Sequence, residues 1–327
     1  MTMGEPAGIG GEILIRAWQV LRESDDCFFV IDDPDRLRRL ADHLGWDLPV
    51  IVIDTPQDAD AAFRDALPVL TQRLPHPVTP GHGDSRNGKA VISAIETAVR
   101  MAITGQIAGV VTNPINKAVL YDAGFTYPGH TEFLTALAGA RTPLMMLANS
   151  ELRVVPVSIH ESLQNAVANL SVDAIVRKAR ITHRALQQDF GIADPVLAVA
   201  GLNPHAGEGG TMGTEEQTIV GPAVELLQSE GIRAIGPMPP DTMFHAAARR
   251  SYDVAICMYH DQALIPLKTI DFDGGVNVTL GLPFVRTSPD HGTAFDIAGT
   301  GTANPQSLIA AIRLASVIAA NRLQPAT

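Results

Sequence analysis

Short apolar runs alternate with longer amphipathic stretches along most of the 327 residues of the chain. This alternation predicts an α/β fold, in which strands and the helices that pack on them follow one another along the chain. The region 55–80 is rich in Asp and Pro and is expected to be a surface excursion with one short strand. The other apolar runs predict strands at residues 28–31, 50–53, 109–112, 144–147, 154–158, 196–200, 254–258 and 276–280.

Amphipathic segments between these runs predict long helices. Asp33 and Pro34 open one that stops at Gly45, because proline suits the first helical position and glycine suits the residue after the last. The other long helices are expected at residues 85–103, 172–188, 213–230 and 305–321.

Only three residues, Met1 to Met3, precede a glycine-rich turn from Gly4 to Gly10 that opens a helix. In an α/β protein such a turn normally follows a complete strand, so we expect either a truncated strand or a start assigned too late. The glycines follow the spacing G-x-x-x-G-x-G, which is not the G-x-G-x-x-G fingerprint of a dinucleotide-binding turn. A tight turn from strand to helix therefore explains this segment as well as a ligand does.

The composition is that of a folded, soluble protein, with 46% hydrophobic and 18% charged residues. The net charge of -11 argues against nucleic acid or an anionic membrane surface as a partner. The sequence has neither an apolar run long enough to cross a membrane nor a signal-peptide pattern, so a cytoplasmic location is expected. An anionic substrate would need a local group of basic residues to overcome the acidic background.

Three of the ten histidines, His160, His205 and His260, lie in polar loops that each follow a predicted strand. Ligands of open α/β sheets gather at the carboxyl ends of the strands, so these residues are expected to converge although they are far apart in sequence. Three imidazoles that leave coordination positions open are typical of a catalytic site for a divalent cation. A single loop histidine more often has a hydrogen-bonding or surface role, but the shared position of all three favours the metal site.

Basic and polar residues follow the third histidine: Lys268, then Asn277 on the next predicted strand, then Arg286. A lysine ammonium and the planar arginine guanidinium suit a phosphate and a carboxylate. His130 and Thr131 mark a predicted helix start, where free backbone N–H groups favour an anion. Each group alone has an ordinary explanation as surface charge or helix cap. Together they predict a small, doubly anionic substrate.

A polar, glycine-containing loop at 290–305 ends in Asn304-Pro305, a pair suited to begin a helix. Its glycines permit close approach of the backbone to a ligand, and His291 and Asp296 are placed to meet the adenosine of a nucleotide. A purely structural turn is the alternative explanation.

Several of these strings resemble the 4-hydroxythreonine-4-phosphate dehydrogenase family of the vitamin B6 pathway. The resemblance runs from Gly4 to the final helix and is densest in GEPAGIG, PGHTEFL, GLNPHAGEGG, MPPDTMF, MYHDQALIPLK and VNVTLGLPFVRTSPDHGTAFDIAG. The stretch 291–305 is also similar to the adenosine-binding loop of isocitrate and isopropylmalate dehydrogenases, whose fold is related.

The resemblance implies an α/β, isocitrate/isopropylmalate dehydrogenase-like fold, with two lobes that share a continuous mixed sheet flanked by helices. Residues 1–125 plus 265–327 would form a cofactor-side lobe that contains both termini. Residues 126–264 would form the lobe of the metal ligands and of dimerisation. The expected assembly is a homodimer with the active site at its interface.

The implied reaction is NAD- or NADP-linked oxidation of 4-phosphooxy-L-threonine, followed by decarboxylation to 3-amino-2-oxopropyl phosphate. The resemblance makes His160, His205 and His260 the ligands of one divalent metal, which is Zn, Mg or Co. The implied substrate contacts are His130, Thr131, Lys268, Asn277 and Arg286. The implied cofactor contacts are His291, Gly292, Thr293, Ala294, Asp296 and Asn304.

A base must take the hydroxyl proton, and Asp241 and Lys268 are both candidates between which the residues do not choose. Relatives that act on threonate or erythronate 4-phosphate would use the same metal and anion groups, so such a substrate is the nearest alternative. A metal-dependent phosphohydrolase would need no nucleotide, and the loop 291–305 argues against it. A binding protein without activity would be expected to have lost a metal ligand, and all three are present.

Overall fold

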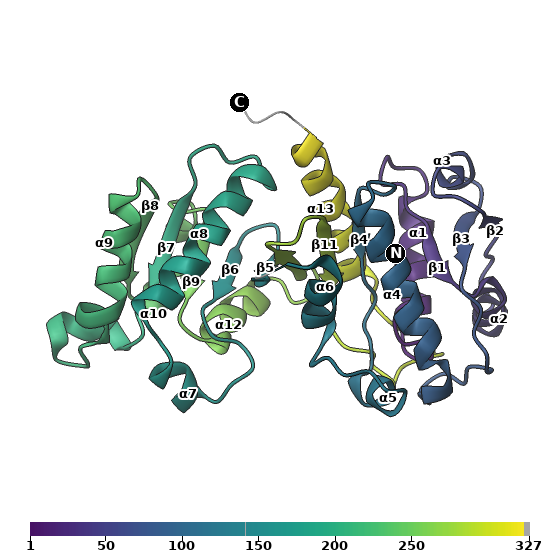
Figure 1. The fold of residues 1–327 in the computed structure, drawn as a ribbon, viewed down its shortest axis with the longest axis horizontal. Helices are drawn as coiled ribbons and strands as arrows, with labels where there is room; N and C mark the ends of the chain where they lie inside the picture. Colours follow the sequence, from purple (N-terminus) through teal and green to yellow (C-terminus); the bar gives the residue numbers. More distant parts are fainter. Residues whose placement is uncertain (141, 324–327) are drawn as a thin grey trace. The chain divides into compact units, whose positions relative to one another are not determined.

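The computed structural model describes residues 1–140 and 142–323, which combine strands and helices in two compact units (Figure 1). Unit 1 comprises Met1–Pro143 and Leu282–Ala319, and unit 2 comprises Leu144–Gly281 together with the chain from Ala320. The expected mixed α/β class is confirmed, because strands and helices alternate along both units.

Unit 1 contains two groups of parallel strands. Three of them pair in the order β1-β3-β2, and β4 pairs with β11 in parallel. Their bounds are Val30–Asp32 for β1, Val50–Ile53 for β2, Leu67–Thr71 for β3, Gly109–Val111 for β4 and Val285–Pro289 for β11. The single strand expected within residues 55–80 is therefore β3.

The first three residues take the place of a strand beside β1 and β4. Thr2 forms parallel bridges with Ile31 and Thr112, and its side chain is fully buried. Its N–H donates to the carbonyl of Val111 at 3.2 Å, while the carbonyl of Met1 accepts from Ile31 at 2.9 Å. The strand that we expected ahead of the glycine-rich turn is thus a single bridging residue.

The helices of unit 1 cover an apolar core to which α4 contributes most. Apolar residues recur on one face of α4 at three- and four-residue spacing, including Val91, Ile95 and Val99, and all three are buried. The helices are α1 (Gly10–Leu21), α2 (Pro34–Leu44), α3 (Asp58–Ala62), α4 (Gly88–Ile103), α5 (Lys117–Asp122), α6 (His130–Ala138) and α13 (Gln306–Leu323).

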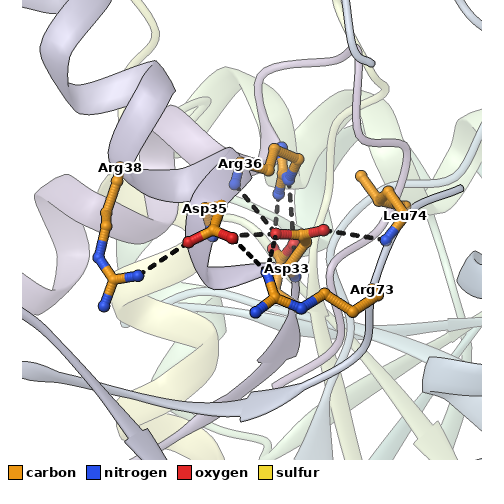
Figure 2. Close-up of polar contacts among 7 residues, drawn as sticks. Asp33, Asp35, Arg36, Arg38, Arg73 and Leu74 are labelled. Atoms are coloured by element: carbon orange, nitrogen blue, oxygen red, sulfur yellow. Dashed lines mark hydrogen bonds and ion pairs between the residues drawn. The ribbon is translucent and has the colours of Figure 1, made fainter. Parts of the chain in front are cut away.

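Helix α2 has the start and stop predicted for it. One carboxylate oxygen of Asp33 accepts from the N–H groups of Asp35 and Arg36, and the other accepts from Leu74 at 3.0 Å (Figure 2). Gly45 follows the last turn in the left-handed conformation, at φ +67. Asp33 therefore caps the helix and also ties it to the segment that follows β3.

Unit 2 is built on six strands in the order β10-β5-β6-β9-β7-β8. The pairs β10–β5 and β5–β6 are antiparallel, and the other three pairs are parallel. The strands are β5 (Leu144–Ala148), β6 (Arg153–Pro156), β7 (Val196–Ala200), β8 (Arg233–Met238), β9 (Val254–Cys257) and β10 (Val276–Leu280). The helices are α7 (Leu163–Ala168), α8 (Val172–Gln188), α9 (Gly221–Ser229), α10 (Pro240–Met243), α11 (Ala246–Arg249) and α12 (His260–Ile270).

Two strands and one long helix were not predicted, and the expected helix 213–230 is a π-helix at Glu216–Val220 followed by α9. Strand β8 was not predicted, because its sequence Arg-Ala-Ile-Gly-Pro-Met has no apolar run. Only Ala234 among its six residues is buried. Strand β11 is buried throughout although it carries Arg286, Thr287 and Ser288. It was not predicted because these polar residues interrupt any apolar run. Helix α12 was missed because Pro266 lies inside it, where a proline normally signals a break. His260 consequently opens a helix and does not lie in a loop.

The boundaries between the two units fall at Pro143/Leu144 and at Gly281/Leu282, whereas the expected lobe boundaries were 125/126 and 264/265. Helix α6 belongs to unit 1, because Phe133 and Leu134 lie in its apolar core. Residues 265–281 belong to unit 2, because all of β10 pairs with β5. The C-terminal end of α13 also belongs to unit 2, where Arg322 forms an ion pair with Asp189.

A buried ion pair supports the start of α2, and it gives a test of this part of the fold. Arg36 donates to Asp32 through Nε at 3.0 Å and through Nη2 at 2.5 Å, and its Nη1 donates to the carbonyl of Pro6 at 2.9 Å. Replacing Arg36 by Met leaves the buried carboxylate of Asp32 without its cation. We expect the free energy of unfolding to fall by about 3–5 kcal/mol in urea titrations.

The matched control is Arg38→Met. Arg38 pairs with Asp35 at 3.0 Å, but this pair is exposed (Figure 2), so its loss should change stability much less. Equal losses in the two variants would show that the buried pair has no special role.

Candidate active site

His160 and His260 lie together in unit 2. Their ring centroids are 6.2 Å apart, and both rings line an open pocket of about 490 Å³ with Glu161, Tyr259 and Asp261. His160 follows β6 and His260 follows β9, and these two strands are parallel neighbours. Their carboxyl ends therefore meet at one edge of the sheet, as the sequence predicted.

Asp261 orients the imidazole of His260. Its Oδ1 lies 2.7 Å from Nδ1 of His260, which opens α12. A proton held on Nδ1 by this carboxylate leaves Nε2 as the lone-pair nitrogen, the arrangement commonly found around metal-binding histidines.

His205 lies in a loop of unusual backbone geometry after β7. The five residues 205–209 all have positive φ, from 41° at Glu208 to 77° at Gly207. The left-handed conformation costs about 1–2 kcal/mol at each residue that is not glycine, and here His205, Ala206 and Glu208 adopt it. Contacts with the rest of unit 2 must therefore hold the loop in place.

Glu216 provides those contacts. Its side chain is buried, and Oε1 accepts from the N–H groups of Leu202 and Asn203, both at 2.7 Å, while Oε2 accepts from the Asn203 amide at 2.9 Å. A Cβ at Gly207 would lie 2.6 Å from Oε2, so glycine is required there. Glu216 was not predicted from the sequence. It follows another glutamate at the start of an amphipathic segment, a pattern typical of a solvent-exposed helix end.

The three predicted metal ligands are not gathered into one group within the chain. Across residues 1–140 and 142–323, no three His, Cys, Asp or Glu side chains lie close enough together to hold a metal ion. The structure brings His160 and His260 together, whereas His205 is exposed on its own loop. Imidazole nitrogens are suitable donors for zinc or cobalt, so the donor types fit the predicted cation.

The other predicted residues of unit 2 lie on α10, α12 and β10. Asp241 is exposed on α10 and lines a second pocket with Tyr259 and Asp261, which also line the histidine pocket. Lys268 lies eight residues after His260, which corresponds to about 12 Å along the helix axis. The Oδ1 atom of Asn277, on β10, is buried without a hydrogen-bond partner among the described residues.

Unit 1 holds a separate cationic group around His130. Arg286, buried on β11, donates to the hydroxyl of Thr112 at 2.7 Å, and burial lowers its pKa to about 10, so it stays charged. Burial and the charges of Arg286 and Lys117 lower the pKa of His130 to about 3. The Nε2 atom of His130, at the start of α6, has no partner among the described residues. Two cations beside a neutral imidazole suit an anion.

Lys117 was not predicted from the sequence. It opens α5, and its Nζ would lie 3.5 Å from a Cβ at Gly129, the residue that precedes His130 and Thr131. Its only sequence cue was a lysine after the polar turn Asn113-Pro114, which indicated no more than a helix start.

The predicted cofactor loop of unit 1 is held by backbone contacts. The carbonyl of Thr293 accepts from the N–H of Ile9 at 3.0 Å, and a Cβ at Gly8 would lie 2.8 Å from this same carbonyl. The glycine-rich turn therefore packs directly against the backbone of the loop at Thr293. The Nε2 atom of His291 is buried without a partner among the described residues, so the loop has a polar atom to offer a ligand.

The remaining residues predicted to contact the cofactor, Gly292, Ala294, Asp296 and Asn304, belong to the same segment. Ala294 is in the left-handed conformation at φ 42°, and Asp296 is exposed. Asn304 is exposed as well and accepts from the N–H of Gln306, so it caps α13 as the sequence suggested.

The sequence matches the family described as pyridoxal phosphate biosynthetic protein PdxA over residues 24–315. The chain belongs to this family. A 4-hydroxythreonine-4-phosphate dehydrogenase of Caulobacter vibrioides is 52% identical to it over 98% of this chain and 97% of the relative. One of Bradyrhizobium diazoefficiens is also 52% identical, over 98% and 96% of the two chains.

Solved structures give the same result for the PdxA fold. The crystal structure of 4-hydroxythreonine-4-phosphate dehydrogenase from Klebsiella pneumoniae has a TM-score of 0.86 and 39% identity, and the match covers 97% of this chain and 98% of that one. A terephthalate 1,2-cis-dihydrodiol dehydrogenase from Burkholderia xenovorans has a TM-score of 0.65 and 31% identity, covering 97% and 96%. The fold expected from the resemblance is confirmed, and the relatives' names support the oxidoreductase class.

No helix in residues 1–140 and 142–323 of this PdxA family member is long and apolar enough to cross a membrane. The roles of the site residues as metal ligands, substrate contacts and cofactor contacts are predictions from the sequence.

The lowered pKa of His130 gives a prediction for this family member. The folded value is about 3 and an ordinary histidine has a value of 6.5, so the unfolded state binds more protons between these pH values. Stability from neutral His130 is therefore complete above the ordinary value and is lost as pH falls toward the folded value. A His130→Asn variant should lose less stability than the wild type between about pH 7 and about pH 4.

Urea unfolding of both proteins across this range measures the difference. Parallel stability curves would contradict the prediction. So would a ring signal of His130 that titrates near neutral pH in nuclear magnetic resonance spectra.

Proposed function

We propose that the protein catalyses the NAD- or NADP-dependent oxidation of 4-phosphooxy-L-threonine at its C3 hydroxyl, in pyridoxal phosphate biosynthesis. The product, 2-amino-3-oxo-4-phosphooxybutanoate, is a β-keto acid and loses carbon dioxide to give 3-amino-2-oxopropyl phosphate. The observation that carries the proposal is 52% identity, over 98% of the chain, to relatives named for this substrate.

The cationic group of unit 1 suits the phosphate of this substrate. Arg286 offers a planar guanidinium and Lys117 a second charge, while neutral His130 offers a hydrogen bond. In a chain of net charge -11 these cations supply the local attraction that an anion requires. Thr131 stands beside His130 in the first turn of α6, where free N–H groups add to the attraction.

In unit 2, Lys268 and Asn277 remain the candidates for further polar contacts with the substrate. The buried Oδ1 atom of Asn277 lacks a partner among the described residues, and a bound substrate could supply its hydrogen bond. Asn277 is fixed by the strand pair β10–β5.

His160, His205 and His260 would hold one divalent cation, namely Zn, Mg or Co. A bound cation stabilises negative charge on the substrate's C3 oxygen and later on the carbonyl oxygen during decarboxylation. The chain contributes by fixing its ligands, since Asp261 orients His260 and Glu216 holds the loop of His205.

The base that takes the hydroxyl proton is Asp241 in this proposal. Asp241 lines the pocket that shares Tyr259 and Asp261 with the histidine pocket, whereas Lys268 lies about 12 Å along α12 from His260. An aspartate near the ligands can accept the proton while the C3 hydride leaves.

The loop from His291 to Asn304 would hold the adenosine half of NAD or NADP. The buried Nε2 of His291 and the close approach allowed by Gly292 fit such a ligand. The bound nicotinamide accepts the hydride, so the protein's part is to bind and orient it.

The protein acts as a homodimer in this proposal, with each active site completed by the second copy. Three large apolar side chains of unit 2 are exposed: Leu163 at 59%, which lines the histidine pocket, Ile265 at 63% on α12, and Phe272 at 75%, beside Lys268. An exposed apolar surface around a site is typical of a protein interface. A second copy would cover this surface and would also add a histidine to the pair formed by His160 and His260.

The nearest alternative is oxidation of a related four-carbon phosphorylated acid, threonate or erythronate 4-phosphate. A specific observation keeps it open: the relative at 31% identity is named for a terephthalate dihydrodiol, so dehydrogenases of this fold differ in substrate. The alternative acids lack the amino group of the proposed substrate.

A substrate panel with both nicotinamide cofactors tests the function. Formation of reduced cofactor, followed by its ultraviolet absorbance, should be fastest with 4-phosphooxy-L-threonine, with kcat/KM at least about tenfold above that for either acid without the amino group. The reverse order would favour the alternative. Release of phosphate without reduced cofactor would overturn the dehydrogenase and point to a phosphohydrolase.

Mixed dimers test the shared site. His205→Ala and His260→Ala should each be inactive alone. After subunit exchange they should regain about one quarter of wild-type activity, because half of the dimers are mixed and each mixed dimer has one intact site. A double variant, His205→Ala with His260→Ala, mixed with either single variant is the control and should stay inactive. Failure of the two single variants to complement would contradict a site that takes these two ligands from different chains.

A further inference from the structure

Glu12 is a buried carboxylate that the proposed reaction does not use. It lies in the first turn of α1, and its side chain is only 1% exposed. Oε1 accepts from the N–H of Gly299 at 2.5 Å, and Oε2 accepts from the N–H of Gly301 at 2.8 Å. A buried carboxylate is costly unless its oxygens are hydrogen-bonded, and here the loop's own backbone provides the partners.

Two further side chains hold the same short segment by its carbonyl groups. Arg16, one turn after Glu12, donates through Nη2 to the carbonyl of Gly301 at 3.0 Å, and its guanidinium lies over the ring of Trp46. The Nε2 atom of His43, on α2, lies 3.2 Å from the carbonyl of Gly299. Donors and acceptors of the segment are therefore both satisfied by side chains of α1 and α2.

The other end of the loop is also fixed to α1. The N–H of Ile9, immediately before the helix, donates to the carbonyl of Thr293. The residues predicted to contact the cofactor run from His291 to Asp296 and resume at Asn304, so Glu12 holds the segment between them. The glycine-rich turn lacks the dinucleotide fingerprint, but it leads into α1 and places the start of this helix in contact with the loop.

We propose that Glu12 is a positioning residue that fixes the loop 291–304 in the conformation that binds the nicotinamide dinucleotide. The proposal rests on the proposed function for its ligand. Glu12 acts through the loop, because each of its oxygens accepts a hydrogen bond from the loop's backbone. Its effect is to order the loop before binding, so that the cofactor does not have to supply that ordering.

Glu12→Gln tests the proposal. The amide keeps the size of the side chain but turns an N–H group toward a backbone N–H, so at least one of the two hydrogen bonds is lost. We expect the dissociation constants of NAD and NADP, measured by calorimetry, to rise about tenfold to a hundredfold. The KM for the cofactor should rise in parallel, with kcat at saturating cofactor little changed, and Co²⁺ should bind as tightly as to the wild type.

Glu23→Gln is the matched control. It removes the same charge just beyond the end of α1, where Glu23 is exposed and pairs with Arg22 at 3.6 Å, and it should bind the cofactor as the wild type does. Arg16→Met is a milder second variant that removes the bond to Gly301 and the contact with Trp46 but leaves both hydrogen bonds of Glu12 in place. It should weaken cofactor binding in the same direction by a smaller factor, and it keeps the test available if Glu12→Gln folds poorly.

Hydrogen exchange separates positioning from a general loss of stability. The amides of Gly299 and Gly301 should exchange faster in Glu12→Gln, while those in the middle of α4 keep their protection. Uniformly faster exchange with an unchanged dissociation constant would mean that Glu12 is merely structural, and it would overturn the proposal.

The exchange measurement also distinguishes this proposal from the function on which it rests. If the wild type bound neither NAD nor NADP, the proposed function would fail, and the role of Glu12 in the loop would still be judged by exchange at Gly299 and Gly301. Unchanged protection at both amides would overturn it.

Discussion

The loops that carry the predicted site have no strand partner, so the hydrogen bonds of their backbone N–H groups must be made in another way. In this protein buried carboxylates make them. Glu12 accepts from Gly299 and Gly301, and Glu216 accepts from Leu202 and Asn203. Both loops contain residues in the left-handed conformation, which would not persist without such partners. The backbone geometry of both predicted site loops therefore depends on two buried glutamates.

Because some carboxylates are buried and hydrogen-bonded, the acidic composition does not describe the surface that a ligand meets. A net charge of -11 suggests a surface that repels anions. However, Glu12, Glu216 and Asp33 are buried and bonded within the protein, so their charges are not presented as an open acidic surface. The cations that face the predicted substrate, Arg286 and Lys117, are concentrated around one histidine. Local arrangement, and not the total charge, decides which ligand can approach.

The sequence predicted those parts of the fold that depend on local pattern. Helix α8 has the predicted bounds because its apolar spacing is regular and Ser171 caps it. The sequence predicted that His160, His205 and His260 converge, and the structure brings His160 and His260 together because β6 and β9 are parallel neighbours. The sequence failed where distant contacts override local preference. Pro266 lies inside a helix, and β11 buries Arg286 and Thr287, which donate to the distant Thr112 and Ala311. Glu12 and Glu216 were missed because their partners are 287 and about 14 residues away, a separation that no local pattern reveals.

Arg286 belongs to β11, and the parallel pairing of β11 with β4 fixes its backbone in the core of unit 1. The backbone position that carries this cation is therefore as rigid as the sheet. Moving it would require the strand register to change. A descendant of this protein that keeps the fold inherits this buried cation with it. New specificity toward the rest of a substrate must then arise in the loops, where a change in sequence leaves the strand pairing intact.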